Sequence, residues 1–311
     1  MKRRVWLAAG ALLPLGLAAQ PWPSRPVHLI VAYPPGGVSD EIARMLAERL
    51  RVVLAVPVVV EHRPGAGGAV AMAALARAAA DGHTLCFSAI SPLTALPRPS
   101  RVDHDLLAGI APVAGVMTTP VLVVGTPALA EDRFDAVLAR ARARPGSVRW
   151  ATSGLGTAGH AVLEQVRRAS GVELTHIPYK GGGQQIGDAL AGQFELLSTN
   201  VAPAQLAYVR AGRLKPLAVG APARLGVLPE VPTLAELGFP DANLASVFGV
   251  FAPAGTPPEV LDRLNAAINR ALAEPALRQR VLSSSNTPAG GSRRSFAELI
   301  AREARRARAS R

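Results

Sequence analysis

Short apolar runs alternate with helix-like patterns along this chain, and that alternation constrains the fold more than any other feature. The run 27–33 (VHLIVAY) is apolar and rich in β-branched residues, which predicts a strand. After it, apolar residues recur at the i, i+3, i+4 spacing of a helix that we expect to begin near Ser39. Because this order repeats, we predict a layered α/β protein whose sheets are largely parallel.

The later segments keep the same order of strand and helix. Apolar runs at 84–90 (TLCFSAI) and 121–125 (VLVVG) predict buried strands, and an alanine-rich helix before the first of them is expected to extend to about Ala80. Two capping-box spacings predict further helix starts, one at Thr256 and Glu259 with Pro257 in the first helical position, the other at Ser295 and Glu298.

The length and the first residues bound the class of protein. A chain of 311 residues with 49% apolar content can bury a full core and is long enough for two domains. Residues 1–19 have a basic start, an apolar stretch and small residues at the end, which predicts a secretory signal peptide cleaved near Ala19 and an exported, periplasmic chain. The single cysteine, Cys86, has no disulfide partner, and we expect it to be buried in a strand.

The charge distribution argues against nucleic acid as a partner. The net charge is +12, but Lys2, Arg3 and Arg4 lie in the predicted signal peptide. Residues 293–311 hold seven arginines against two glutamates, so little of the excess belongs to the body of the chain. Aromatic residues are only 4% of the sequence and none interleaves with the basic tail, so the stacking surfaces of single-strand binders are missing.

Glycine joins a strand to a helix three times in the sequence. The junctions are PPGG before Asp40, SGLGTAG before His160 and YKGGG before Gln184. A helix N-terminus offers unpaired N–H groups and a partial positive charge, and glycine lets an anion approach the backbone closely. Glycine loops also connect strands and helices in many proteins without binding anything. Three in one chain favour a cleft for a carboxylate or a phosphate.

The second junction permits an alternative function. Gly154, Gly156 and Gly159 have the G-x-G-x-x-G spacing, and Glu173 stands 19 positions beyond Gly154, which is the outline of a dinucleotide-binding enzyme. Against it, Glu173 begins the predicted strand at 173–177, whereas the acidic residue of that fold should end the second strand.

Catalytic and metal sites are not indicated. The six histidines are scattered without the spacing of zinc ligands, and no G-x-S-x-G motif is present for a hydrolase serine. We therefore expect no catalytic residues, no metal and no cofactor. His160, in the first turn of its helix, either donates to an anion or packs and caps the helix, and the sequence leaves both roles open.

Six segments, in order and with similar spacing, resemble the motifs of the tripartite tricarboxylate transporter receptors, also called Bug proteins. The resemblance implies a two-lobed periplasmic binding protein of type II, with 24–120 plus 250–311 in lobe one and 121–249 in lobe two. The runs VLVVG and VFGVFAP would cross between the lobes. The six segments are 29–50, 56–68, 151–160, 176–193, 214–240 and 248–268.

The resemblance also implies function and site residues. Family members are receptors rather than enzymes, and they bind small organic carboxylates, such as di- and tricarboxylates, acidic amino acids and aromatic carboxylates, for membrane permease subunits. We expect a monomer. The residues that match the family's binding motifs are Tyr33, Gly36, Gly37, Ser88, Ser91, Ser153, Gly154, Gly156, Thr157, His160, Tyr179 and Asn200.

Some positions depart from the family pattern. The segment 91–109 is shorter than usual, and His62, Glu195 and Val247 replace asparagine, aspartate and tryptophan, so we expect these positions to reshape the pocket. Asp40 matches the motif, but a carboxylate would repel an anionic ligand, and we interpret it as a favourable charge at the helix start.

Overall fold

The computed structural model describes residues 22–94 and 108–309, so the predicted signal peptide and most of the unusual segment 91–109 lie outside it. The described strands form one mixed sheet in the order β2-β1-β3-β9-β4-β7-β5-β6, and β4 also pairs with β10 near its middle and with β8 over its last five residues. The strands are β1 (Val27–Val31), β2 (Val58–His62), β3 (Thr84–Ala89), β4 (Ile110–Gly125), β5 (Arg149–Thr152), β6 (Thr175–Pro178), β7 (Leu196–Asn200), β8 (Lys215–Gly220), β9 (Ala245–Pro253) and β10 (Thr287–Pro288).

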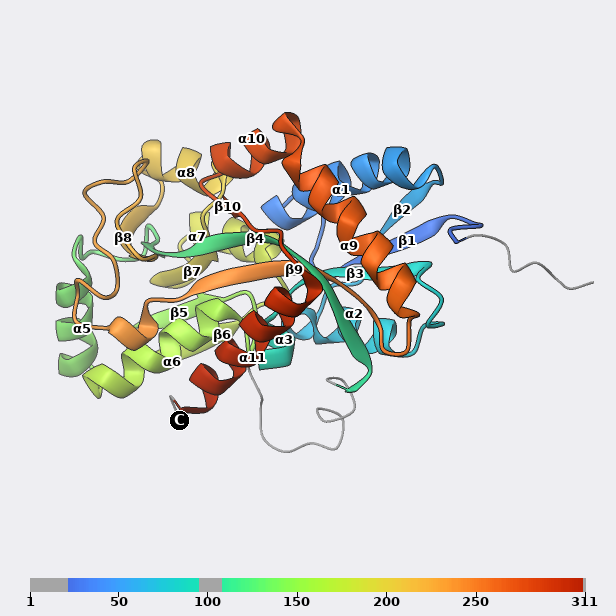
Figure 1. Cartoon of the computed structure of the whole chain (residues 1–311). Helices are drawn as coiled ribbons and strands as arrows, with labels where there is room; N and C mark the ends of the chain where they lie inside the picture. The colour runs from blue at the N-terminus through green and yellow to red at the C-terminus, as the bar shows by residue number, and fades with distance from the viewer. Residues whose placement is uncertain (1–21, 95–107, 310–311) are drawn as a thin grey trace, which may run out of the picture.

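The 16-residue strand β4 joins two halves of the sheet. Its residues 110–120 pair antiparallel with β9, and residues 121–125 pair with β7 and β8. Figure 1 shows β4 and β9 running side by side across the middle of the molecule. We call the elements packed on β1, β2, β3 and β9 lobe one, and those on β5 to β8 lobe two. The predicted two-lobed architecture is confirmed, and VLVVG is the second part of one long crossing strand.

Helices cover both faces of each half of the sheet. In lobe one, α1, α9 and α10 pack on one face, while α2 and α11 pack on the other. In lobe two, α5 and α6 share one core and α7 and α8 the other. The helices are α1 (Val38–Leu54), α2 (Ala69–Ala76), α3 (Ser91–Thr94), α5 (Phe134–Ala143), α6 (Ala158–Ser170), α7 (Gly182–Leu190), α8 (Pro203–Arg210), α9 (Pro258–Ala273), α10 (Pro275–Ser283) and α11 (Arg293–Ala309), with 3-10 turns at Ala66–Gly68 and Pro240–Ala242.

The predicted strand at 121–125 has an unbroken apolar run because both of its faces are buried. Val121 and Val123 enter the core under α5 and α6, whereas Leu122 and Val124 enter the core under α7 and α8. A strand covered on both faces has no polar alternation, because neither side-chain direction meets water. Cys86 in β3 is also fully buried, as expected, and burial raises the pKa of its thiol.

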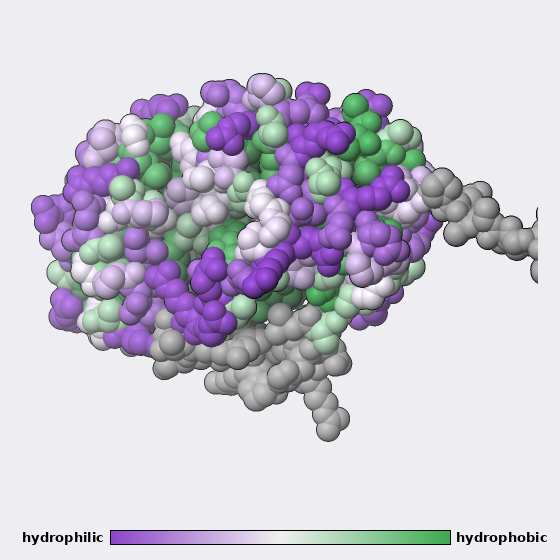
Figure 2. Space-filling model, in the orientation of Figure 1, coloured by the Kyte–Doolittle hydropathy of each residue, from purple (hydrophilic) through white to green (hydrophobic). Residues whose placement is uncertain are grey.

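The arginine-rich C-terminus is an amphipathic helix and not an unstructured tail. Phe296 and Ile300 of α11 are buried against lobe one, and the Phe296 ring lies over Gly115 and Gly249 of the two crossing strands. Arg302 is exposed on the opposite side. Hydrophilic side chains predominate where α11 crosses the face in Figure 2.

Both predicted capping boxes are wrong. Helix α9 begins at Pro258, its cap is Pro257, and no side chain caps it, since the Thr256 hydroxyl donates to the Pro253 carbonyl at 2.8 Å. At α11, the Ser295 amide donates to the Ser292 hydroxyl, so the capping oxygen lies three residues earlier than predicted. Helix α2 also ends at Ala76, four residues before the expected end. None of the helices in residues 22–94 and 108–309 has the length and apolarity of a membrane span.

Candidate functional site

A cavity of about 550 Å³ lies between the two lobes, and all three glycine junctions open onto it. Lobe one contributes residues 33–41 from the β1–α1 junction. Lobe two contributes Ser153 and residues 157–159 from the β5–α6 junction, and Gly182 and Gly183 from the start of α7. The expectation that these junctions share one cavity is confirmed.

We use "mouth" for the N-terminus of a helix where it opens onto the cavity. The α1 mouth presents backbone amides to the cavity and no capping side chain. Gly37 is the N-cap, and no side chain caps the helix, so the first amides of α1 lack intrahelical acceptors beside the cavity. The Gly36 amide is different, because it donates to the Asp40 carboxylate at 2.9 Å. Gly36 itself adopts a φ of +89°, which an L-residue rarely takes.

Asp40 lines the cavity, yet its carboxylate is fully engaged. One oxygen accepts from Gly36, and the other accepts from Arg44 Nε at 2.8 Å and contacts His62 Nε2 at 2.7 Å. Burial disfavours the charged form, but the hydrogen bonds from Gly36 and His62 and the charge of Arg44 outweigh it, so the pKa of Asp40 lies below its usual value. The negative charge therefore organises the loop and is partly neutralised before a ligand arrives.

The α6 mouth is built in the same way, with a different acceptor. Thr157 is the N-cap and accepts from the His160 amide, while its hydroxyl donates to the Gly154 carbonyl at 2.8 Å. The Gly156 amide donates to His160 Nδ1 at 3.2 Å. The first helical amides, those of Ala158 and Gly159, stand beside the cavity.

Two further helix starts complete the wall from lobe two. Helix α7 begins after Gly181 and helix α8 after Ala202, and neither cap residue supplies a side-chain hydrogen bond. The cavity is thus faced by the N-termini of α1, α6, α7 and α8. Since each carries a partial positive charge, the four together favour an anion without requiring a cationic side chain.

The cavity brings together seven of the twelve residues predicted from the sequence. Tyr33 packs edge-on against Phe248 with ring centroids 5.7 Å apart, and burial raises the pKa of its phenol to about 12, so the hydroxyl stays a donor. Asn200 accepts from the Ser246 hydroxyl at 2.8 Å, which ties β7 to β9 at the cavity. The seven lining residues are Tyr33, Gly36, Gly37, Ser91, Ser153, Thr157 and Asn200.

The other five predicted residues lie behind the cavity wall. The Tyr179 hydroxyl donates to Asp188 at 2.7 Å, and Ser88 is fully buried in β3. The His160 ring packs against the His176 ring, with centroids 4.6 Å apart and the planes tilted by 33°. Gly154 and Gly156 shape the loop that carries Thr157, and no residue of this group lines the cavity: Ser88, Gly154, Gly156, His160 and Tyr179. Contact of these five with a ligand stays a prediction.

Sequence reasoning missed the start of α8 and the basic residue of the wall. Pro203 in the first helical position is a recognised helix-start signal, and it could have identified the α8 mouth. Arg280 of α10 also lines the cavity, although it is 239 residues from its ion-pair partner Glu41. No local pattern could have placed these two side chains together.

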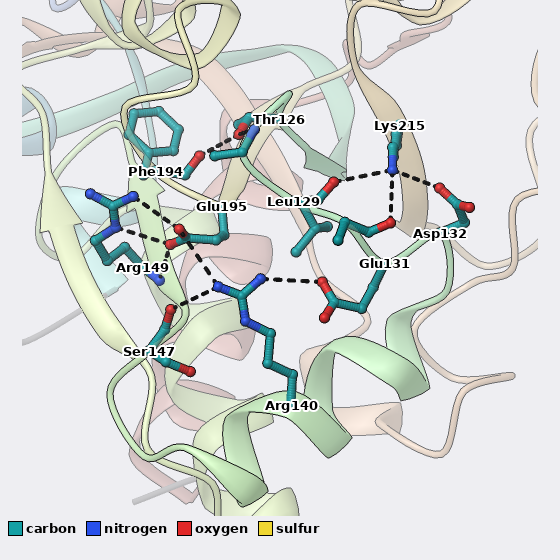
Figure 3. A network of polar contacts seen from close by, with 12 residues as sticks. Thr126, Leu129, Glu131, Asp132, Arg140, Ser147, Arg149, Phe194, Glu195 and Lys215 are labelled. Carbon is teal, nitrogen blue, oxygen red and sulfur yellow. Dashed lines mark hydrogen bonds and ion pairs between the residues drawn. The ribbon is translucent and has the colours of Figure 1, made fainter.

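Glu195 belongs to an ion network in lobe two and is not among the cavity-lining residues. Figure 3 shows its carboxylate held by Arg149, whose Nε and Nη2 donate at 3.0 and 2.9 Å, with Arg140 approaching to 3.9 Å. Arg140 also pairs with Glu131. Glu195 precedes β7, whereas Asn200 at the other end of that strand lines the cavity, so Glu195 is placed to stabilise the lobe.

Two further departures from the family pattern, His62 and Val247, lie outside the cavity lining. His62 contacts Asp40 and so supports the β1–α1 loop from behind. Val247 lies between Ser246 and Phe248 in β9, and only those two neighbours line the cavity. No group of three or more potential metal ligands occurs among the residues that the structure describes.

The geometry disfavours the dinucleotide alternative. Glu173 is exposed and precedes β6 instead of following it. The Gly154 and Gly156 amides are consumed by Thr152 and His160, so they do not form a phosphate cradle. A Cβ at Gly159 would lie 2.6 Å from the Ser198 hydroxyl, and this glycine is therefore explained by packing of α6 on β7.

Two α/β lobes joined by crossing strands, with helix N-termini from both lobes facing one cavity, define a periplasmic solute-binding protein. The family model described as tripartite tricarboxylate transporter family receptor matches residues 42–310. BugT of Bordetella pertussis (strain Tohama I) is 39% identical over 282 residues, which are 90% of this chain and 86% of BugT. The chain belongs to the tripartite tricarboxylate transporter receptor family, which is a family of receptors and not of enzymes.

Solved structures agree in fold. The R. palustris protein Rpa4515, solved with adipate, is 30% identical and superposes with a TM-score of 0.85, covering 93% of this chain and 97% of its own. MatC from Rhodopseudomonas palustris, with bound malate, is 27% identical, with a TM-score of 0.84 over 93% of this chain and 99% of its own.

Proposed function

We propose that this protein captures a small organic carboxylate between its lobes and delivers it to the membrane permease of a tripartite transporter. The observation that carries the proposal is the convergence of the α1, α6, α7 and α8 N-termini on one cavity. The carboxylates named for two relatives, adipate and malate, support the ligand class. No step of bond making or breaking is needed.

Binding would couple to closure of the lobes. Lobe one offers the N-terminus of α1 and lobe two offers those of α6, α7 and α8, so a carboxylate gains most when both lobes reach it at once. A ligand shifts a conformational equilibrium by its differential affinity for the two states, and here the closed state has more donors. The resemblance implied 24–120 plus 250–311 for lobe one; we propose 24–120 plus 245–311 instead, because residues 110–120 of β4 pair with all of β9, which begins at Ala245.

Export follows the same proposal. The segment 1–19 is proposed to be a signal peptide cleaved near Ala19, which places the mature receptor in the periplasm where it meets both solute and permease. The mature protein is proposed to act as a monomer.

Gly37→Asp tests the proposed function. Position 37 lines the cavity, has an ordinary φ of −91°, and has room for a Cβ, whose nearest neighbour would be Ser39 Oγ at 3.9 Å. A fixed negative charge there is expected to abolish carboxylate binding without unfolding the protein, whereas the neutral Gly37→Asn retains most of it. Gly156→Asp is less suitable, because a φ of +74° would strain any side chain.

The assay is a thermal-shift screen of the mature protein against carboxylates, amino acids, NAD and nucleotides, followed by calorimetry. A ligand that binds the folded state raises the melting temperature as its concentration exceeds its Kd. A carboxylate that stabilises wild type and Gly37→Asn, but not Gly37→Asp, supports the proposal. Stabilisation by NAD or a nucleotide alone, or equal carboxylate affinity in folded Gly37→Asp, contradicts it.

A further inference from the structure

Three charged side chains line the cavity, and they differ in how fully they are engaged. Asp40 accepts hydrogen bonds or ion pairs at both oxygens. The other two, Glu41 of α1 and Arg280 of α10, face each other and pair only with each other among the described side chains. Arg280 is thus the one cationic side chain that lines the cavity among the residues that the structure describes.

The Glu41–Arg280 pair leaves binding capacity unused. Arg280 Nε donates to Glu41 Oε1 at 2.6 Å, and Nη2 contacts the same oxygen. Neither Arg280 Nη1 nor Glu41 Oε2 has a partner among residues 22–94 and 108–309. A guanidinium has five N–H donors, and its strong mode of carboxylate binding uses two parallel hydrogen bonds. The pair with Glu41 uses one carboxylate oxygen, so the guanidinium can accept a second anion.

The Glu41–Arg280 ion pair is also weak enough for Arg280 to bind a ligand carboxylate as well. The side chains of Arg280 and Glu41 are 38% and 39% exposed, and ion pairs at such sites are typically worth about 0–1 kcal/mol. Glu41 lies in the first turn of α1, four residues after the Gly37 cap, so its backbone is roughly 6 Å along the helix from the N-terminus at about 1.5 Å per residue, and Arg280 contacts its side chain. A ligand whose first carboxylate occupies the amide mouths could therefore reach Arg280 with a second carboxylate.

We infer that Arg280 is a specificity-determining residue that favours dicarboxylates over monocarboxylates of the same length, and that Glu41 moderates this preference. The inference rests on the proposed function, because it presumes that one carboxylate occupies the helix mouths. Glu41 holds the guanidinium in place and its charge opposes the second carboxylate. Removing Glu41 therefore strengthens the preference, and removing Arg280 leaves an unpaired glutamate that reverses part of it.

The experiment measures affinities by calorimetry for matched pairs of ligands: succinate and butyrate, adipate and hexanoate, suberate and octanoate. The readout is the ratio of dicarboxylate to monocarboxylate affinity for the best pair. Arg280→Gln is expected to lower this ratio by roughly tenfold, the size expected of one charge-assisted hydrogen bond. Glu41→Gln is expected to raise it several-fold, and Arg280→Lys to keep part of the preference.

Arg278→Gln is the matched control. Arg278 is on the same helix and carries the same charge, but it is exposed and does not line the cavity. The control should leave the ratio unchanged, which separates a local contact from the overall field of the protein. Circular dichroism and melting temperature establish that each variant is folded.

The outcomes separate the inference from the proposed function. Wild type that binds no member of either series, although another carboxylate binds in the screen, overturns the inference alone; wild type that binds no carboxylate at all contradicts both. Wild type that binds dicarboxylates with a ratio unmoved in Arg280→Gln and Arg280→Lys, or lowered equally in Arg278→Gln, overturns the role of Arg280 and leaves carboxylate capture standing. A wild-type preference for monocarboxylates also overturns it.

Discussion

Gly67 lies in close contact with the opposite lobe, and its replacement by alanine gives a direct test of closure. Gly67 is in the 3-10 turn before α2 in lobe one, with a φ of +64°. A Cβ at this position would lie 2.8 Å from the carbonyl oxygen of Leu155 and 3.1 Å from Thr157 Cγ2, both in lobe two. A backbone oxygen cannot rotate away as a flexible side chain could, so closure would have to stop short.

The expected magnitude has two separable parts. An L-residue in the left-handed region costs about 1–2 kcal/mol in the open and the closed state alike. The overlap with Leu155 exists only when the lobes are closed, and overpacking of this kind costs about 1–3 kcal/mol. Because only the second part acts on the open–closed equilibrium, Gly67→Ala is expected to weaken carboxylate binding by about 5- to 150-fold.

Gly171→Ala is the matched control for the backbone part. Gly171, at the end of α6, has a φ of +66°, nearly that of Gly67, and a Cβ added there would meet no atom within 4 Å. Both variants should lose similar stability in chemical denaturation, but only Gly67→Ala should lose affinity in calorimetry. Small-angle scattering with saturating ligand should give a larger radius of gyration for Gly67→Ala. Equal affinities in the two variants would refute the closure argument.

The remaining predictions concern stability and pH. Arg149→Ala removes both guanidinium hydrogen bonds to the Glu195 side chain, which is 7% exposed, and leaves it the backbone amide of residue 149 at 2.8 Å and a distant ion pair with Arg140; we expect a loss of about 1–3 kcal/mol in chemical denaturation. Burial opposes ionisation of Glu195 but Arg149 outweighs it, so the pKa is lowered, and the stabilisation is present at neutral pH and lost as pH falls through the acidic range; Glu195→Gln should flatten that dependence. Burial, with His160 nearby, lowers the pKa of His176 to about 4, so the unfolded chain binds the proton first and stability should fall as pH drops from about 6.5 toward 4. After allowance for solvent screening the loss at pH 5 is about 1 kcal/mol, and His176→Gln should remove it; an unchanged pH profile of the melting temperature would contradict this.

Local patterns predicted most of the fold because β1, β3 and the second part of β4 are short, strongly apolar runs followed by helical patterns or turns. The first part of β4 was missed for a physical reason. Residues 110–120 include Pro112, Gly115 and Pro120, which weaken a strand pattern, and β-bulges interrupt the pairing with β9 there. The partner strand is more than a hundred residues away, so its contribution to the strand is invisible in any local window.

The sequence predicted where the site lies, but not which groups in it are free to contact a ligand. Glycine junctions identified three of the helix mouths, because such loops have to leave backbone bare. The spacing could not show which amides remain available, since Gly36 and Gly156 lie in the same motifs yet donate inward. The pairing of Arg280 with Glu41 depends on the packing of α10 against α1, which only the folded chain defines.

The N-termini of α1 and α6 are organised by the same type of hydrogen bond, with a different acceptor in each lobe. In each, a glycine of positive φ precedes the N-cap and donates its amide to the side chain four residues later, Asp40 for Gly36 and His160 for Gly156. The carboxylate keeps its acceptor role down to pH values below its usual pKa, because that pKa is lowered. The imidazole loses its acceptor when Nδ1 is protonated, and burial lowers the pKa of His160, so this happens only below the ordinary histidine range. As the pH falls, the α6 N-terminus should therefore be disturbed before the α1 N-terminus. The affinity for a fully ionised carboxylate should first decrease when His160 is protonated and its hydrogen bond from Gly156 is lost.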